Sequence, residues 1–430
     1  MGKLRHLRWY IAALLFTSTV INYIDRQTIA VLKPRLMADL HLSQIEYGRI
    51  IQGWLIAYTV MYVVSGFLVD RWGTRRALAV FVGWWSFANL LHVFARTGGQ
   101  LRFFQVLLGV GEPGNYTAAG RIASEWYPPG ERATINGLVN AGSAVGAILA
   151  IPLVAWLAIS YGWRHAFFVT GLLGFIWLIP WLKFFRLPAN HSSITDDELD
   201  YIQSGQEMFS PDGKNGIRHL IRRRDLWGLM VARFFSDPVW WFYLFWLPGF
   251  LQEQRSFTLQ EVALFGWLPY LASDIGGVAG GWISDRLIRF TGNPVQARLI
   301  PMAICAFVMP ISLLVPRMQS QVWLIAVFCI VAFALMGWKT NLMTITNDVY
   351  PMDCIGTISG FLMLGSGVGG FLFQGIVAHM AQTSSYKPIF VMMGFMHICA
   401  LLICISVLYR EGPTRQPPQR SAVAVEKLKA

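Results

Sequence analysis

The chain has 430 residues, of which 55% are apolar and only 13% charged, so it lies outside the range of soluble globular proteins. Its formal net charge of +12 would suit a nucleic-acid partner only if the basic residues formed one patch. They lie instead in short polar segments between long apolar stretches. This pattern predicts a multi-pass membrane protein and no nucleic-acid partner.

Runs of about 20 mostly apolar residues, the length that crosses a bilayer, recur along the whole chain. We predict an all-α membrane protein with twelve transmembrane helices, at residues 9–31, 47–69, 77–95, 101–126, 134–157, 163–185, 226–251, 260–284, 298–316, 320–344, 355–380 and 387–409. Most basic residues fall on one side of these spans. The positive-inside rule then places both termini in the cytoplasm.

Two adjacent ionisable residues, Asp25 and Arg26, lie inside the first predicted span. A charge is costly there, so such residues are functional candidates by default. The acid can carry a proton, and the planar guanidinium can bind a carboxylate through two parallel hydrogen bonds. Neighbouring positions on a helix point about 100° apart, so the two side chains need not pair with each other.

The second span carries an aromatic stripe, because Trp54, Tyr58 and Tyr62 recur every four residues and share one helix face. Aromatic rings with hydroxyl groups suit a sugar ring. A stripe that merely packs helices together is an equally good interpretation for Trp54 and Tyr62.

A glycine-rich, charged loop follows the second span and has a counterpart after the eighth. We expect its acids and basic residues to latch one side of the protein, with glycine allowing a close helix approach; the alternative is that the arginines are only orientation signals. The gating candidates are Gly66, Asp70, Arg71, Gly73, Arg75, Arg132, Asp285 and Arg286.

Glu112 lies about eleven residues into the fourth span, which places it near the bilayer centre. Burial favours the neutral form of a carboxylic acid, and the proton can leave when water arrives. We therefore predict a proton carrier, with a fixed structural ion pair as the alternative. Other polar residues within the spans can bond sugar hydroxyls or other helices. They are Asn115, Asn140, Ser143 and Asn341.

The two halves of the chain echo each other. Gly66 and Asp70 recur as Gly281 and Asp285, and the series from Tyr127 to Gly146 recurs at the same offsets from Tyr350 to Gly369. Because each half holds an even number of spans, the repeats run parallel, and such repeats place a binding site between the halves. We expect a six-helix bundle at 1–186, a cytoplasmic linker with a short helix at 187–225, a second bundle at 226–410 and a disordered tail at 411–430.

Several stretches resemble known sequences. The loop after the second span reads GFLVDRWGTRR and resembles the signature of the major facilitator superfamily. The stretches NYIDR, GVGEPGN, EWYP and DPVWWFY resemble the anion:cation symporter family, and within it the bacterial hexuronate transporters. The resemblance runs from Leu7 to about Arg410. It implies a major facilitator fold in a bacterial inner membrane.

The resemblance also implies roles for single residues. Glu112 matches the proton-coupling acid, and Tyr58 matches a substrate-site tyrosine. Trp241 belongs to the aromatic run Trp240–Trp246, which is partly an interfacial belt and, by the resemblance, partly cavity wall. The chain departs from the family at Gln105, where the family has an arginine that partners the acid at the position of Asp25. We therefore expect Asp25 to lack its cation and coupling to rest on Glu112. Arg102, one turn away from Gln105, is an alternative partner.

We predict a proton-coupled symporter that imports a sugar acid anion, a hexuronate such as galacturonate or glucuronate, by alternating access, with Arg26 binding the carboxylate. Another organic anion, such as an aldonate or aldarate, is the alternative substrate; a dicarboxylate would require a second buried cation, with Lys339 and Arg233 as candidates.

A membrane-embedded enzyme or sensor has no support, because no H-E-x-x-H or G-x-S-x-G motif and no soluble domain is present. We expect no metal and no cofactor, with protons as the coupling ion. The expected partners are a small carboxylate substrate and the lipid bilayer, and we expect a monomer.

Overall fold

The structure is a computed structural model that describes residues 6–203, 222–350, 355–383 and 386–408. These residues are almost entirely helical and include no strand. The predicted tail at 411–430 and most of the linker's second part lie outside the described residues.

The first half of the chain contains long helices and a few short ones. They are α1 (Leu7–Val31), α2 (Lys33–Asp39), α3 (Gln44–Trp72), α4 (Thr74–Leu91), η1 (His92–Phe94), α5 (Gly98–Gly111), α6 (Gly114–Trp126), α7 (Pro129–Tyr161), α8 (Trp163–Phe184), η2 (Pro188–Asn190) and α9 (Asp196–Gln203). The second half also consists of long helices and a few short ones. Its helices are α11 (Arg224–Phe245), α12 (Leu247–Arg255), α13 (Leu259–Phe265), α14 (Leu268–Thr291), α15 (Pro294–Val308), η4 (Met309–Arg317), α16 (Gln321–Val349), α17 (Ile355–Gln382) and α18 (Lys387–Leu408).

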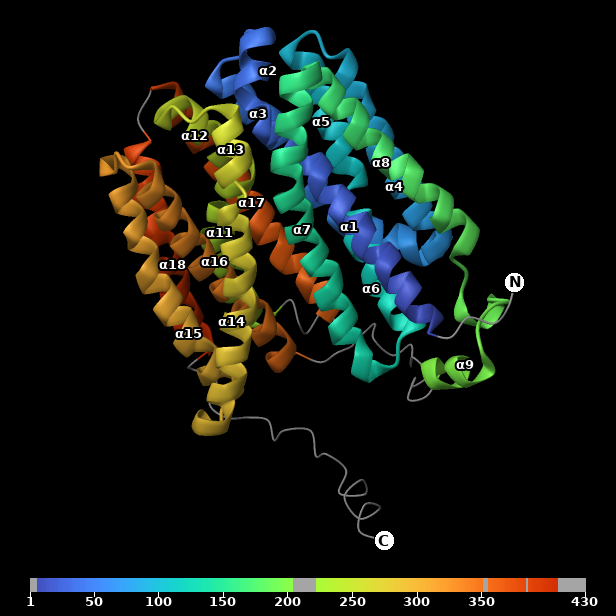
Figure 1. The fold of residues 1–430 in the computed structure, drawn as a ribbon. Coiled ribbons are helices and arrows are strands. Elements are labelled where there is room, and N and C mark those ends of the chain that lie inside the picture. The colour runs from blue at the N-terminus through green and yellow to red at the C-terminus, as the bar shows by residue number, and fades with distance from the viewer. Residues whose placement is uncertain (1–5, 204–221, 351–354, 384–385, 409–430) are drawn as a thin grey trace.

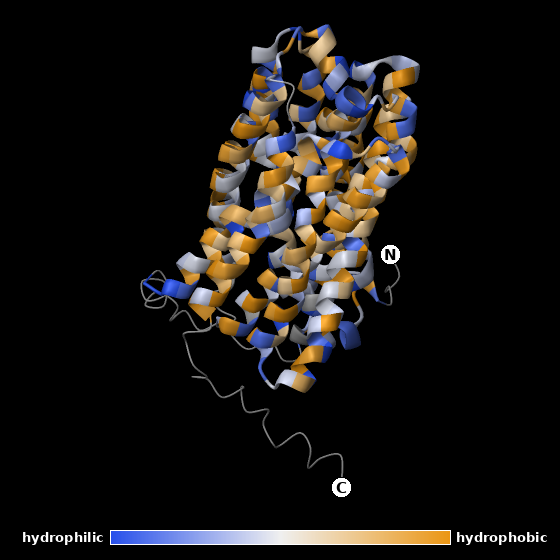
Figure 2. Ribbon diagram, turned by 90° about the vertical axis from the view of Figure 1, so that its left-hand side faces the viewer, coloured by the Kyte–Doolittle hydropathy of each residue, from blue (hydrophilic) through white to orange (hydrophobic). Residues whose placement is uncertain are grey.

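The described helices account for all twelve predicted spans. Ten helical segments are long and apolar enough to cross a membrane. The other two are α5 with α6, which are interrupted beside Glu112, and α11 with α12, where α11 carries Asp225, Arg233 and Asp237. Large apolar side chains such as Phe67 are exposed around the bundle, and polar residues gather mainly toward its ends (Figure 2). The protein is therefore an all-α, multi-pass membrane protein.

The two halves of the chain lie side by side, with blue-to-green helices on one side and yellow-to-red helices on the other (Figure 1). In the first half α1 packs on α7 and α3 on α5, while in the second α11 packs on α17 and α14 on α16. The halves meet chiefly along α3 and α17, with further contacts from α7 to α13 and α14.

Glycines explain the longer sequence echo. A Cβ on Gly142 or Gly146 would lie 2.7 or 2.5 Å from a backbone oxygen of α1. At the matching positions, a Cβ on Gly365 or Gly369 would lie 2.3 or 2.2 Å from a backbone oxygen of α11. Both repeats thus use the same glycine pair to bring equivalent helices into backbone contact.

The halves are joined by polar contacts at the distal end of the bundle, meaning the end around α2 and α12, away from the terminal end near residues 6 and 408. Lys33 Nζ lies 2.9 Å from Glu253 Oε2, which also accepts a 2.9 Å hydrogen bond from Gln44 Nε2. Tyr47 donates to the backbone oxygen of Phe245 at 2.8 Å. Lys33 is fully buried, and these contacts form a seal between the halves at this end.

The terminal end is more open. A Cβ added to Gly66, Gly137 or Gly360 would meet no atom within 4 Å. Asp70 is 67% exposed there. The close helix approach at Gly66 that the sequence predicts is therefore absent in this conformation.

We expect Glu253→Gln to destabilise the seal, because it leaves the Lys33 ammonium buried without its counter-charge. Removing one partner of a buried ion pair costs about 3 kcal/mol. Lys33→Met in the same background should recover most of the loss, since it removes the stranded charge. Thermal melting of the purified variants measures both effects, and an unchanged melting temperature for Glu253→Gln would contradict a stabilising seal.

Candidate functional site

The centre of the bundle holds a buried ion pair between α1 and the break in the fourth span. Arg26 Nε and Nη2 both donate to Glu112 Oε2, at 3.0 and 2.9 Å. The side chains are 1% and 0% exposed. Asn22, one turn earlier on α1, accepts a further 3.1 Å hydrogen bond from Nη2. The sequence predicted both residues but left open whether they meet, and the structure brings them together.

The two residues that follow Glu112, Pro113 and Gly114, explain why the fourth span is interrupted there. Pro113 has no backbone N–H and cannot continue α5, so α5 ends at Gly111 and α6 begins at Gly114. A Cβ on Gly114 would lie 2.1 Å from the Phe81 ring of α4, so only glycine fits. The acid therefore projects from a short interruption between two helices rather than from a helix interior.

Aromatic rings surround the guanidinium of Arg26. Its central carbon lies 4.6 Å from the ring centroid of Tyr23, 5.0 Å from that of Trp54 and 4.9 Å from that of Tyr58. Each such contact contributes about 0.5–2 kcal/mol, more where water is excluded. The cage holds Arg26 charged and in a fixed orientation next to Glu112.

The predicted aromatic stripe of α3 forms one wall of this cage. Trp54 stacks on Tyr58 at 4.8 Å, and Tyr62 follows at 6.1 Å. Trp241, from α11 of the second half, meets Trp54 edge-on at 5.8 Å and Tyr58 at 6.4 Å. The sequence predictions for these four residues thus converge on one cluster that spans both halves.

Asp25 points elsewhere and has no cation among the described residues. Its Oδ1 accepts a 2.6 Å hydrogen bond from Asn89 Nδ2 on α4. Gln105 instead bonds His92 Nε2 at 2.8 Å, and Arg102 is exposed. Arg102 therefore does not replace the missing cation. Asn89 and His92 were not predicted from the sequence, although two polar residues three positions apart in an apolar span indicate a buried polar contact.

We expect Asp25→Asn to change transport only modestly, because an asparagine oxygen can still accept the hydrogen bond from Asn89. A neutral hydrogen bond contributes about 1 kcal/mol, which limits the change in apparent affinity to about fivefold. Uptake driven by a pH gradient in proteoliposomes measures it. A loss of accumulation with normal exchange would instead place Asp25 in proton coupling.

The predicted polar residues of the spans are mostly engaged in helix packing. Asn115 accepts from Ser18 at 2.8 Å and donates to Thr19 at 2.9 Å, which ties α6 to α1. Asn341 donates to the backbone oxygens of Gly280 and Gly337 and ties α14 to α16. These two contacts follow the interhelical interpretation in this conformation.

Asn140 and Ser143 lie on the more open face of α7. Asn140 Nδ2 donates to Asn136 O at 2.9 Å, and Ser143 Oγ donates to Asn140 O at 2.6 Å. Asn140 is exposed and Ser143 is half-buried.

The gating candidates of the first half bind within their own half. Asp70 lies 3.6 Å from Arg121 on α6, whose neighbour Glu125 accepts from Thr74 at 2.8 Å. Gly73 has φ +75°, so it makes the tight turn between α3 and α4. The other three also stay on this side: Arg71 is exposed, Arg75 donates to Leu182 O, and Arg132 donates to Tyr127 O.

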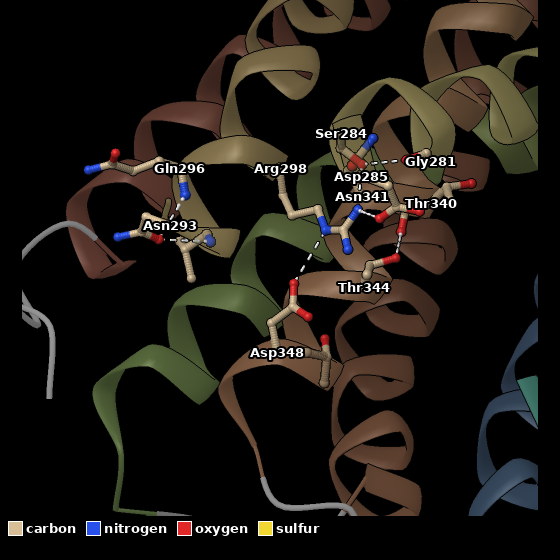
Figure 3. A network of polar contacts seen from close by, with 12 residues as sticks. Gly281, Ser284, Asp285, Asn293, Gln296, Arg298, Thr340, Asn341, Thr344 and Asp348 are labelled. Carbon is tan, nitrogen blue, oxygen red and sulfur yellow. Dashed lines mark hydrogen bonds and ion pairs between the residues drawn. The ribbon is translucent and has the colours of Figure 1, made fainter. Parts of the chain in front are cut away.

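The second half repeats this arrangement with a different cation. Arg298 on α15 donates to Asp285 at 2.5 Å and to Asp348 at 3.3 Å, joining α14, α15 and α16 (Figure 3). Arg286 instead lies over the Trp282 ring at 3.8 Å. Neither Arg298 nor Asp348 was predicted from the sequence. The internal repeat was a signal for Asp348, because Asp348 precedes Tyr350 at the same spacing as Glu125 precedes Tyr127.

A family model, the Major Facilitator Superfamily, matches residues 15–374. The chain belongs to this superfamily. It is 32% identical to the hexuronate transporter of Escherichia coli K12, over 95% of each chain. It is 33% identical to the galacturonate transporter of Dickeya chrysanthemi, over 72% of this chain and 91% of that one. A probable galactarate/D-glucarate transporter of Bacillus subtilis, GudP, is 28% identical over 96% and 94%.

Solved structures of the superfamily share the fold. A bacterial homologue of the lysosomal transporter Spinster, in an inward-facing and occupied conformation, superposes with a TM-score of 0.73 at 17% identity, covering 94% of this chain and 96% of that one. The nucleoside transporter NupG gives a TM-score of 0.68 at 12% identity, covering 92% and 99%. As a major facilitator protein, the chain is a membrane transporter and not an enzyme.

Proposed function

We propose that this major facilitator protein is a proton-coupled symporter for a sugar acid anion, a hexuronate such as galacturonate or glucuronate. The observation that carries the proposal is the buried Arg26–Glu112 pair inside its aromatic cage. Hexuronate and galacturonate transporters among the relatives support the substrate class. The substrate is a small carboxylate, and we propose that the protein acts as a monomer without a bound cofactor.

The pair offers a direct way to couple a proton to an anion. While Glu112 is ionised, it occupies the guanidinium of Arg26 and leaves no free donor pair for a carboxylate. A proton on Glu112 removes that competitor, and the substrate carboxylate then takes its place on Arg26. Each state keeps the buried guanidinium paired with one anion, so proton and substrate bind together. The aromatic rings of Tyr58 and Trp241 cover the sugar.

The same geometry supports alternating access. We propose that the distal end faces the periplasm and the terminal end faces the cytoplasm of the bacterial inner membrane, following the positive-inside rule. The Lys33–Glu253 seal then makes this conformation inward-facing. Rocking one half against the other would open the distal end and bring Asp70 and Gly66 against the opposite half.

Counterflow in proteoliposomes tests this function. Purified protein is reconstituted in four sets of vesicles, each loaded with one unlabelled acid (galacturonate, glucuronate, galactonate or galactarate), and the same acid is offered outside in labelled form. We expect rapid exchange of the hexuronates. No exchange of either hexuronate would reject the proposed substrate, and exchange of galactonate or galactarate alone would favour the aldonate or aldarate alternative.

A further inference from the structure

A second charged cluster lies in the other half of the bundle and has no role in the coupling pair. Arg233 and Asp237, one turn apart on α11, form a salt bridge of 2.7 Å and are 6% and 4% exposed. Lys339 on α16 is the third charge, and its electrostatic neighbours include both of them. Two cations and one anion leave this cluster with a net positive charge.

The surplus charge resides on Lys339. Asp237 is engaged by the fork of Arg233, with an Nε distance of 2.9 Å. Among the described residues, the ammonium of Lys339 has no hydrogen bond and no carboxylate within 4.0 Å; it lies 5.5 Å from the Trp240 ring centroid. An ammonium in a membrane span without an anion is costly. It is thus ready to receive an anionic or hydroxyl oxygen.

Two consecutive tryptophans of α11, Trp240 and Trp241, relate the position of Lys339 to that of Arg26. Trp241 packs on the aromatic cage of Arg26, at 5.8 Å from Trp54, while Trp240 lies beneath Lys339. Neighbouring positions on a helix point about 100° apart, so the two cations flank adjacent faces of α11. Arg26 and Tyr23 of the first half are also electrostatic neighbours of Lys339. Lys339 therefore lies within electrostatic reach of the Arg26 site.

We propose that Lys339 is a specificity-determining residue that binds the end of the sugar acid opposite the carboxylate held by Arg26. This inference rests on the proposed function. In this arrangement the ammonium donates to distal hydroxyl groups of a hexuronate. A second carboxylate at that end, as in an aldarate, would make a charge–charge contact with the same ammonium, so the binding of an aldarate depends on Lys339 more strongly than the binding of a hexuronate does.

Competition against labelled galacturonate exchange tests the proposal with three probes: galacturonate, galactarate and glycolate. Glycolate carries the carboxylate but lacks the rest of the sugar. Lys339→Gln should weaken galacturonate at least about tenfold and galactarate more, as expected for hydrogen bonds to a charged group. Glycolate inhibition should stay unchanged. Lys339→Arg should keep most of the affinity, and Lys387→Gln, an exposed lysine at the start of α18, is the matched control.

Each outcome decides the proposal. Equal weakening of all three probes would mean that Lys339 acts on the whole cavity or on the carboxylate, and unchanged affinities would remove it from the site; both overturn the inference while leaving the transport function intact. Absence of galacturonate and galactarate exchange in the wild type would overturn the proposed function itself. If Lys339→Gln does not fold, Lys339→Met is measured by quenching of tryptophan fluorescence in detergent, with the same expected ratios.

Discussion

Glu112→Gln should abolish accumulation of a sugar acid against its gradient while sparing exchange. Glutamine keeps an oxygen that can accept from Arg26, but it cannot take up or release a proton. With one proton per anion, an imposed gradient of one pH unit sustains about tenfold accumulation in the wild type. The variant should only equalise the two sides. Labelled galacturonate uptake in proteoliposomes, with and without the pH gradient, measures the effect.

Counterflow in the same vesicles is the internal control, because exchange needs binding and reorientation but no net proton movement. We expect it to persist in Glu112→Gln. Gradient-driven accumulation that survives the substitution would remove Glu112 from coupling. Loss of both activities would mean that the residue only holds the site together, in line with the structural ion-pair interpretation.

Arg26→Gln should be the most damaging single change to the fold and to binding, because it leaves the Glu112 carboxylate buried without its cation. Breaking one partner of a buried pair costs about 3–5 kcal/mol. The double variant Arg26→Gln with Glu112→Gln should be more stable than Arg26→Gln alone, since no charge is then stranded. Thermal melting of the wild type, both single variants and the double variant gives the interaction energy between the two residues.

Arg26→Lys separates charge from geometry at the same position. It keeps a cation for Glu112 but loses the planar fork and its packing between Tyr23, Trp54 and Tyr58. We expect stability close to the wild type and galacturonate affinity lower by about ten- to a hundredfold, the range for a lost hydrogen bond to a charged group. Tryptophan fluorescence titration measures the affinity. Undiminished affinity would show that the carboxylate binds elsewhere.

The structure changes the interpretation of several residues that the sequence predicted together. Asn115, Asn341 and Glu112 are all polar residues inside spans, yet only Glu112 meets a cation; the other two tie helices together. Local pattern cannot separate these roles, because both need the same residue type at the same depth. The difference depends on which helix stands opposite.

Sequence patterns are similarly limited in predicting the partners of the charged loops. The sequence predicted that the charged loops latch one side of the protein but not which residues would pair, and in this conformation Asp70 and Asp285 each bind a cation of their own half, Arg121 or Arg298. A transporter has more than one stable arrangement of its halves, and sequence patterning is the same in all of them. The open terminal end therefore had to come from the structure.

The amino-acid sequence was enough to predict the membrane class, the twelve spans, the parallel repeat and the two candidate residues Arg26 and Glu112. Those features follow from hydropathy, helical period and the cost of burying charge, which act locally or through residue type alone. The packing of the helices was needed to show that Arg26 binds Glu112 rather than Asp25, that Asn89 donates to Asp25, and that Lys339 has no carboxylate partner among the described residues. Partners of buried charges are fixed by the packing of helices distant in sequence, and spacing along one chain cannot specify them.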